Sequence, residues 1–205
     1  MANTQTFKRL APPGRGAMAA KRLFDIVCAA CGLVVLSPLF LITALAVGLT
    51  SPGGILFCQE RIGLGGKPFI IYKFRTMRKE NSGLKITASG DDRITPVGRI
   101  LRKTKLDELP QLFNVLFGSM SLVGPRPERP YFVERFKEEI PRYMIKHQVR
   151  PGMTGWAQVN GYRGDTSITK RIECDLYYVE NWTLLLDFKI LFLTFFGRNT
   201  NKNAY

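Results

Sequence analysis

A long uncharged stretch near the N-terminus limits what this chain can fold into more than any other feature. It runs from Ile26 to Leu49, about 24 residues without a charged side chain, which is long enough for a helix to cross the hydrocarbon core of a bilayer. Ser37 and Pro38 lie at its centre. Because proline lacks an N–H and its ring clashes with the preceding turn, a helix must kink or break there. The stretch is therefore predicted to form two helical halves in a membrane.

Two arrangements of these halves are open: a kinked helix that spans the bilayer, and a re-entrant hairpin that enters and leaves on the same side. Basic residues flank the stretch on both sides, and such residues favour the cytoplasm. They are Lys8, Arg9, Arg15, Lys21 and Arg22 before it, and Arg61, Lys67, Lys73 and Arg75 after it. The charge pattern favours the re-entrant hairpin, in which the Ser37 hydroxyl satisfies a backbone group that the break at Pro38 leaves without a partner.

The charge balance restricts the kind of partner. The chain of 205 residues is long enough for one domain with a hydrophobic core, and it carries 30 Lys and Arg against 16 Asp and Glu, a net charge of +14. Such an excess predicts anionic partners, which are nucleic acid, anionic lipid or phosphorylated substrates. A solvated basic surface without a ligand explains the charge equally well. The sequence holds no nucleic-acid-binding motif, so nucleic acid is not expected as a partner.

Residues 105–128 contain the side chains best suited to chemistry. Asp107 and Glu108 are adjacent and precede a short apolar stretch, and Arg126 follows between two prolines. Asp107 is predicted to be the N-cap of a helix, where backbone N–H groups favour its ionised form and also offer a phosphate site. Helix capping alone is the simpler interpretation. Adjacent carboxylates followed by a rigidly held guanidinium favour a metal-dependent phosphate site instead.

These blocks resemble the bacterial sugar transferase family, whose members are monotopic membrane enzymes. The resemblance is carried by YKFRTM (72–77), LDELPQLFNVL (106–116), SLVGPRP (121–127) and RPGMTGWAQVNG (150–161), and it extends from about Lys21 to Thr194. It implies a phosphoglycosyl transferase that moves a sugar 1-phosphate from a nucleoside diphosphate sugar to undecaprenyl phosphate. This reaction initiates exopolysaccharide, O-antigen or glycoconjugate assembly. The chain is similar to the minimal catalytic form of the family, without the N-terminal spanning helices of larger members.

The resemblance also implies roles for single residues. Asp107 would attack the β-phosphate and form a covalent aspartyl phosphosugar, while Glu108 would hold Mg²⁺ or manage the acceptor's proton. Both carboxylates are expected to bind the Mg²⁺ cofactor. With UDP-hexose as the expected donor, UMP is released. The residues expected to bind phosphate are Lys73, Arg75, Arg102, Lys105, Arg126 and Arg163.

We expect a mostly helical α/β fold in one membrane-associated domain. Residues 1–20 are predicted to be a flexible basic tail, 21–50 the re-entrant helix-break-helix, and 51–205 a catalytic domain on the cytoplasmic face of the bacterial inner membrane. Within that domain we predict a hairpin and, beyond the helix that follows Asp107, three further helices, with the last one lying in the membrane interface or packed on the core because it is too short to span. The predicted bounds are 55–60 and 68–74 for the hairpin strands, and 135–148, 168–180 and 184–196 for the helices. His147 is expected at the surface.

Two other functions are compatible with the sequence. A basic, membrane-tethered module could bind lipid or nucleic acid without catalysis, although carboxylates within a basic region would repel phosphate unless a metal intervened. A phosphatase acting on the same lipid would need a base to activate water, a role that Glu108 could fill.

The partners that the resemblance implies are a UDP-sugar, undecaprenyl phosphate and the lipid bilayer, and self-association into a homo-oligomer is left open. The sequence does not identify the sugar.

Overall fold

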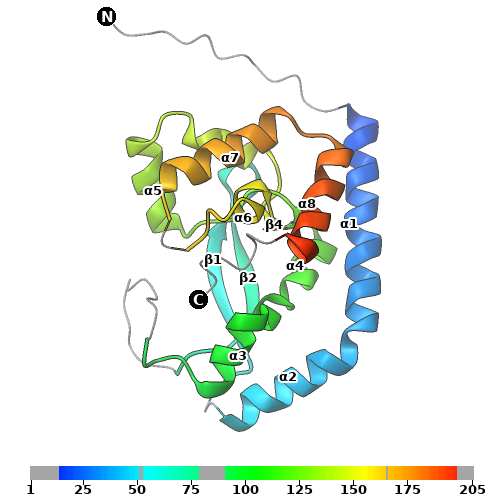
Figure 1. The fold of residues 1–205 in the computed structure, drawn as a ribbon, viewed down its shortest axis with the longest axis vertical. Coiled ribbons are helices and arrows are strands. Elements are labelled where there is room, and N and C mark those ends of the chain that lie inside the picture. The colour runs from blue at the N-terminus through cyan, green and yellow to red at the C-terminus, as the bar shows by residue number, and fades with distance from the viewer. Residues whose placement is uncertain (1–13, 51–52, 79–90, 165, 198–205) are drawn as a thin grey trace, which may run out of the picture.

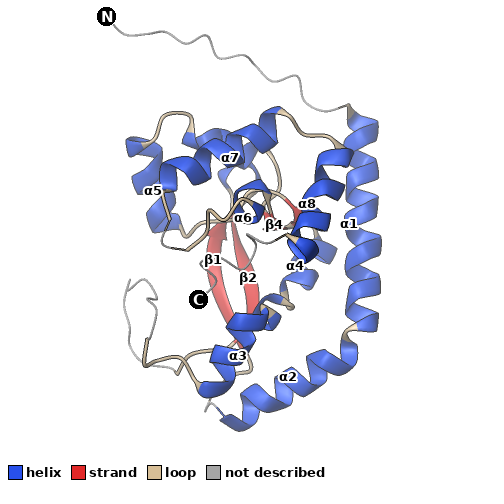
Figure 2. Ribbon diagram, in the orientation of Figure 1, coloured by secondary structure: helices blue, strands red, loops and turns tan. Residues whose placement is uncertain are grey.

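Helices dominate the computed structural model, which describes residues 14–50, 53–78, 91–164 and 166–197 (Figure 1, Figure 2). The α-helices are α1 (Arg15–Val35), α2 (Ser37–Thr50), α3 (Pro96–Thr104), α4 (Gln111–Phe117), α5 (Pro130–Glu139), α6 (Trp156–Val159), α7 (Ile168–Glu180) and α8 (Leu184–Phe196). The strands are β1 (Leu56–Ile62), β2 (Pro68–Phe74), β3 (Ser121–Val123) and β4 (Gly152–Thr154). Short 3-10 helices are η1 (Leu64–Gly66), η2 (Leu106–Glu108) and η3 (Tyr143–Gln148). The predicted mostly helical α/β fold is confirmed.

The break at Ser37 and Pro38 has the predicted structure. Pro38 has no N–H to donate to the carbonyl of Val34, and the Ser37 hydroxyl donates to that carbonyl instead at 2.8 Å. The helix axis bends by 64° between α1 and α2. In Figure 1, α1 runs along one side of the molecule and α2 turns across its lower end. The serine thus replaces the hydrogen bond that the proline removes, as the sequence predicted.

No single helix among the described residues is both long and apolar enough to cross a bilayer, whereas α1 and α2 meet these two criteria together as a bent pair. Their outward side chains are apolar: Val34 and Val35 are each 74% exposed, and Leu49 is 86% exposed. The helix begins at Arg15, so the predicted boundary between tail and helix at residue 20 is wrong. Residues 1–13 of the predicted tail lie outside the described residues.

The predicted hairpin is confirmed. Strands β1 and β2 pair antiparallel from Leu56 opposite Phe74 to Ile62 opposite Pro68, and they lie at the centre of the molecule (Figure 1). One face of β2 packs on α1 and α4 through a buried cluster of Ala29, Ile71, Leu112, Val115 and Met120. The second sheet, in which β3 and β4 pair in parallel, was not predicted. It leads directly into the turn that carries Arg126.

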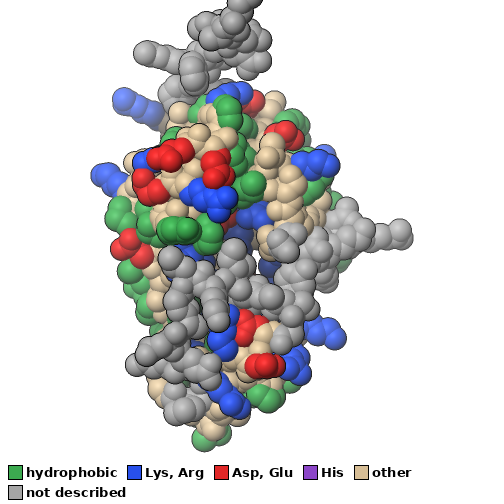
Figure 3. Space-filling model, turned by 90° about the vertical axis from the view of Figure 1, so that its left-hand side faces the viewer, with side chains coloured by type: hydrophobic (Ala, Val, Ile, Leu, Met, Phe, Trp, Pro, Cys, Tyr) green, Lys and Arg blue, Asp and Glu red, His purple; other side chains and the backbone are tan. Residues whose placement is uncertain are grey.

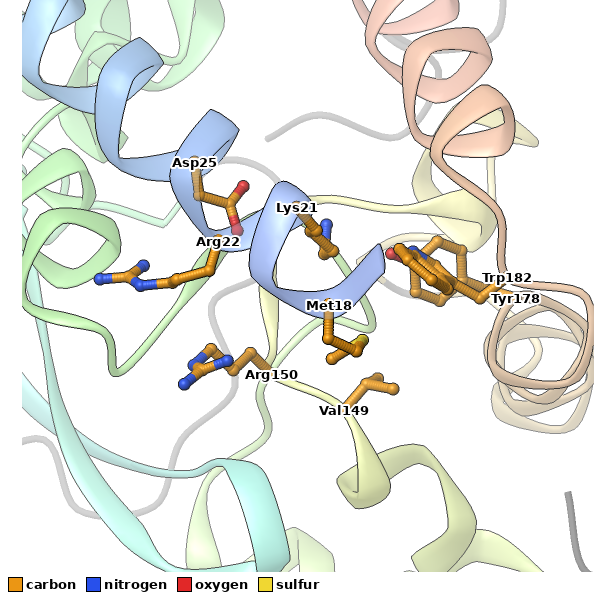
Figure 4. A pocket seen from close by; sticks show the side chains of 8 residues that line it. All are labelled: Met18, Lys21, Arg22, Asp25, Val149, Arg150, Tyr178 and Trp182. Carbon is orange, nitrogen blue, oxygen red and sulfur yellow. The ribbon is translucent and has the colours of Figure 1, made fainter. Parts of the chain in front are cut away.

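A buried polar network fastens α1 to the rest of the domain. The Lys21 ammonium lies 2.6 Å from the Asp187 carboxylate of α8 and donates to the Val123 carbonyl at 3.2 Å. The Tyr178 hydroxyl donates to Asp187 at 2.7 Å, and Asp25 accepts from the Leu122 N–H at 3.0 Å. Figure 4 shows the small pocket beside this network, which contains none of the predicted site residues. The network supports the end of β3, from which the Arg126 turn begins.

Two predictions about the second half of the chain are wrong. Residues 135–148 do not form one helix, because α5 ends at Glu139 and η3 begins after Pro141 and the left-handed Arg142. His147 is only 5% exposed rather than at the surface, and burial lowers its pKa to about 4. It follows Lys146, which forms a buried ion pair with Asp175 of α7 at 2.7 Å.

The two C-terminal helices have the predicted bounds. On α7 the predicted apolar face includes the buried Ile172, but Asp175 and Tyr178 are buried as well. On α8 the buried face consists of Asp187 and Ile190. Its other side is apolar and exposed, with Leu185 78% and Phe195 79% exposed. Helix α8 is therefore packed on the core along one side and presents apolar side chains on the other.

Candidate active site

The two adjacent carboxylates lie on η2, a single 3-10 turn between α3 and α4. The chain enters it through Lys105, whose φ of 61° lies in the left-handed region. The Glu108 N–H donates to the Lys105 carbonyl at 3.1 Å. Helix α4 begins only after Pro110, which occupies the N-cap position without a side-chain cap. The prediction that Asp107 is the N-cap of this helix is wrong, because the chain forms a separate turn before the proline.

Glu108 is held by two cations from distant parts of the chain. Its Oε1 lies 2.7 Å from the Lys73 Nζ of β2 and 3.0 Å from the Arg126 Nη2 of the proline-flanked turn. Burial alone would raise the pKa of Glu108, but the charges of Lys73 and Arg126 outweigh burial and lower this pKa well below its ordinary value. Glu108 is therefore a fixed anion at neutral pH, and it sets the positions of both cations.

Asp107 has the opposite electrostatic character. The residue is 9% exposed, and burial raises its pKa to about 6 although Lys73, Arg102 and Arg126 act to lower it. A carboxylate of raised pKa is a better nucleophile and proton acceptor than an ordinary aspartate. The two adjacent acids thus divide into one that is locked in ion pairs and one that titrates near neutral pH.

Further cations surround the two acids. Arg102 on α3 donates from Nε to the Thr76 hydroxyl at 2.8 Å. Helix α3 lies so close to this segment that a Cβ on Gly98 would be 2.1 Å from the Thr76 carbonyl oxygen. Burial, followed by the charge of Arg163, lowers the pKa of Lys105. Such crowding of like charges favours an anionic ligand among them.

Arg163 lies in the same group of charges. Burial, followed by the charge of Arg126, lowers the pKa of Arg163, while the two carboxylates Glu108 and Asp107 act to raise it. The structure thus brings five of the six predicted phosphate ligands to the two acids: Lys73, Arg102, Lys105, Arg126 and Arg163. Figure 3 shows Lys and Arg side chains recessed near the middle of one face of the molecule.

Arg75 is the predicted ligand that the structure places elsewhere. Its guanidinium lies against the turn after α2, where a Cβ on Gly53 would be 2.0 Å from the Arg75 Nη1. Arg75 is not among the charges that shift the pKa of Asp107 or Glu108 most. Since side chains alternate along a strand, Lys73 and Arg75 would share a face only if β2 continued, and β2 ends at Phe74.

Three charged residues beside the site were not predicted. Arg61 of β1 donates to the Pro127 carbonyl at 3.0 Å, and burial, followed by the charge of Arg126, lowers its pKa to about 10. Glu128 follows the same turn and forms an ion pair with Arg171 of α7 at 3.2 Å. Only Glu128 had a signal in the sequence, because it directly follows Pro127. The contacts of Arg171 with Glu128 and of Arg61 with Pro127 join residues 43 and 66 positions apart, and no sequence pattern indicates them.

Binding of Mg²⁺ by Asp107 and Glu108 stays a prediction. Within the described ranges there is no group of three or more His, Cys, Asp or Glu side chains that could hold a metal. Mg²⁺ is often bound by only one or two carboxylates together with substrate phosphates and water. Lys73 and Arg126 both contact Oε1 of Glu108, so these ion pairs do not use its second oxygen.

An acidic pair ringed by cations is typical of proteins that bind phosphorylated ligands, and the bent apolar helix pair is a candidate for insertion into a membrane. The chain belongs to the bacterial sugar transferase family, whose model matches residues 16–199. This match covers nearly all of the described structure, including every predicted site residue. The resemblance found in the sequence is therefore confirmed.

Curated relatives are similar over most of this chain. A UDP-glucose:undecaprenyl-phosphate glucose-1-phosphate transferase of Klebsiella pneumoniae is 49% identical over 194 residues, 92% of this chain and 42% of its own length. A UDP-N-acetylgalactosamine-undecaprenyl-phosphate N-acetylgalactosaminephosphotransferase of Aeromonas hydrophila is 50% identical over 85% of this chain and 42% of its own length. The exopolysaccharide production protein PSS of Rhizobium leguminosarum bv. phaseoli is 44% identical over 90% of this chain and 98% of its own length. The chain thus spans about two fifths of the first two relatives and nearly all of the third.

Proposed function

We propose that the protein transfers a sugar 1-phosphate from a nucleoside diphosphate sugar to undecaprenyl phosphate and thereby initiates exopolysaccharide synthesis. The observation that carries this proposal is the contrast between the two acids, with Asp107 buried at a pKa of about 6 beside an ion-paired Glu108. The names of the relatives support the two substrates. Because those relatives use different sugars, the donor sugar stays open, with UDP-hexose as the first choice.

The proposed reaction has two displacements at phosphorus. In the first, an Asp107 oxygen attacks the β-phosphorus of the donor, the bond from that phosphorus to the bridging oxygen breaks, and the nucleoside monophosphate leaves. In the second, a phosphate oxygen of the lipid attacks the same phosphorus and the Asp107 carboxylate is released. Magnesium, when bound by Asp107 and Glu108, would neutralise charge on the phosphoryl oxygens.

The surrounding cations have a defined task in both displacements. Two anions must approach each other, and guanidinium groups bind phosphate oxygens through paired N–H donors. Arg126 is held in place by Glu108, and Arg102 by Thr76. Because these hydrogen bonds exist before a substrate arrives, little reorganisation is needed when charge develops at the phosphorus.

The α1–α2 pair is proposed to enter and leave the membrane on the cytoplasmic side. The 64° bend and the exposed apolar side chains on both helices support this arrangement, as do the basic residues on both flanks. The exposed apolar side of α8 would lie in the interface. This depth suits an acceptor whose phosphate is at the headgroup level while its chain stays in lipid.

The test is an assay of UMP release. The protein in nanodiscs is incubated with Mg²⁺, undecaprenyl phosphate and a panel of UDP-sugars. Release of UMP that requires both the lipid and Mg²⁺ supports the proposal and identifies the sugar. Inorganic phosphate as the product, in place of a lipid diphosphate sugar, would indicate the phosphatase. Binding of anionic lipid without any turnover, with other nucleotide donors also tested, would contradict the proposal and favour the binding module.

The pKa of Asp107 predicts how this activity depends on pH. A nucleophilic carboxylate must be ionised, and with a pKa of about 6 its ionised fraction falls steeply as pH drops below 6. We expect kcat/KM to fall about tenfold from pH 7 to pH 5. An aspartate with an ordinary pKa would leave the rate nearly flat over this range, and a flat profile would therefore contradict the role of Asp107.

A further inference from the structure

The loop between α6 and α7 presents Arg163 to the acidic pair. It is bounded by Gly161 and Gly164, whose φ angles of 85° and 62° lie in the left-handed region. On the α6 side, the Tyr162 N–H donates to the Ala157 carbonyl at 2.9 Å. The loop must hold Arg163 near Arg126, a group of the same charge. Because like charges repel, an attachment on the other side of the loop would stabilise this placement.

Arg171 on α7 supplies that attachment. Its Nη2 donates to the Gly164 carbonyl at 2.6 Å and its Nη1 to Glu128 Oε1 at 3.2 Å. Glu128 lies two residues after Arg126 and is itself tied to β1, since its carbonyl accepts from the Ile62 N–H at 3.0 Å. The ion pair is largely shielded, with side-chain exposures of 11% for Arg171 and 13% for Glu128. One guanidinium thus joins the two segments that carry two cations of the site.

We propose that Arg171 is a positioning residue that, through Glu128, fixes the Gly161–Gly164 loop so that Arg163 and Arg126 face the same phosphate group of a substrate. This inference rests on the proposed function, which supplies two phosphorylated substrates. Ordering the loop before binding removes an entropic cost from the binding step. The role requires an arginine at position 171, because its guanidinium reaches both the Gly164 carbonyl and Glu128, whereas a lysine ammonium is a single point of charge. Both substrates carry the chemistry that Arg163 and Arg126 would recognise.

The matched pair of variants is Arg171→Met and Glu180→Gln. Both change a charged residue of α7, but Glu180 forms its ion pair with Arg142 at the surface, away from the site. For Arg171→Met we expect KM for one of the two substrates to rise about tenfold, with a smaller change in kcat; Arg171→Lys should be intermediate. The substrate whose KM rises is the one that Arg163 contacts. Unchanged KM values for both substrates in Arg171→Met would overturn the inference.

A double variant separates positioning from a general loss of structure. If Arg171 acts through Arg163, then Arg163→Gln with Arg171→Met should raise KM no further than Arg163→Gln alone. Additive increases would overturn the inference. Should Arg171→Met not fold, the same comparison is made with Arg171→Lys. If the wild type releases no UMP, the proposed function fails, and the positioning role of Arg171 is tested separately by the thermal stabilisation that inorganic pyrophosphate gives. This stabilisation should shrink in Arg171→Met and persist in Glu180→Gln; equal stabilisation in both would overturn the inference.

Discussion

Asp107→Asn should lower kcat for UMP release by at least about 10³-fold, because an amide cannot form the covalent link to phosphorus. The variant keeps the size of the side chain, and Glu108 keeps its contacts with Lys73 and Arg126. The measurement is single-turnover UMP release in nanodiscs with a fixed donor. Asp92→Asn is the control, since Asp92 is an exposed aspartate outside the site, and it should retain wild-type turnover.

The same substitution should not reduce stability at alkaline pH. Burial raises the folded-state pKa of Asp107 to about 6, so its linked contribution to stability is fully present below its unfolded pKa, near 3.9, and is lost as pH rises through 6. At pH 8 the wild type buries an ionised carboxylate, and Asp107→Asn should be more stable by on the order of 2 kcal/mol. An inactive variant that is also destabilised at pH 8 would contradict this account.

Glu108→Gln is expected to destabilise the fold as well as abolish activity. Without the carboxylate, the partly buried cations Lys73 and Arg126 face each other unpaired. Removing one partner of a fully buried ion pair costs about 3–5 kcal/mol. Because Glu108 and its two partners are only partly buried, this cost is an upper bound, and the fall in Tm should be at most roughly 20 °C for a domain of this size. Thermal unfolding at pH 7 in one detergent measures this difference.

A second substitution tests whether charge is the cause. Lys73→Met added to Glu108→Gln removes one of the two unpaired cations, so the double variant should recover part of the lost Tm without recovering activity. The apolar methionine suits the burial of this position. A double variant that is less stable than Glu108→Gln would show that the ion pairs are not what couples these residues.

Local signals account for the parts of the fold that the sequence predicted. Ser37 and Pro38 determine the helix break because proline lacks an N–H within its own turn. Glycines between two β-prone stretches predicted the hairpin, an amphipathic pattern predicted α7 and an apolar run predicted α8, both with the observed bounds. Each of these signals lies within a few residues of the feature that it specifies.

Most of the features that the sequence did not predict depend on contacts between distant residues. Strands β3 and β4 have three residues each, which is too short for a recognisable pattern, and their parallel pairing joins segments 31 positions apart. The error in residues 135–148 has a local cause, since Pro141 should have ended the predicted helix. His147 was misplaced because its polar neighbours suggested exposure, whereas Lys146 is buried by its ion pair with Asp175.

The candidate site was predicted as a set of residues rather than as an arrangement. The two acids and five of the six cations come together, but the sequence could not show that Lys73 and Arg126 both select Glu108. Because both cations pair with Glu108, Asp107 titrates near neutral pH. Its pKa is determined by burial rather than by helix capping. Burial arises from packing of the whole domain, and therefore no motif encodes it.

The ion pair between Lys21 and Asp187 also sets an order of events during synthesis. The ribosome adds Lys21 166 residues before Asp187, an interval of roughly 10–30 s at ordinary elongation rates. For most of this interval α1 and α2 are already synthesised, while the Lys21 ammonium has no Asp187 carboxylate to pair with. The Val123 carbonyl, which precedes the Arg126 turn, receives the Tyr178 hydroxyl as a donor, in addition to Lys21, only when α7 docks. The support of the β3 end that precedes the Arg126 turn is therefore completed only after α7 and α8 have been synthesised.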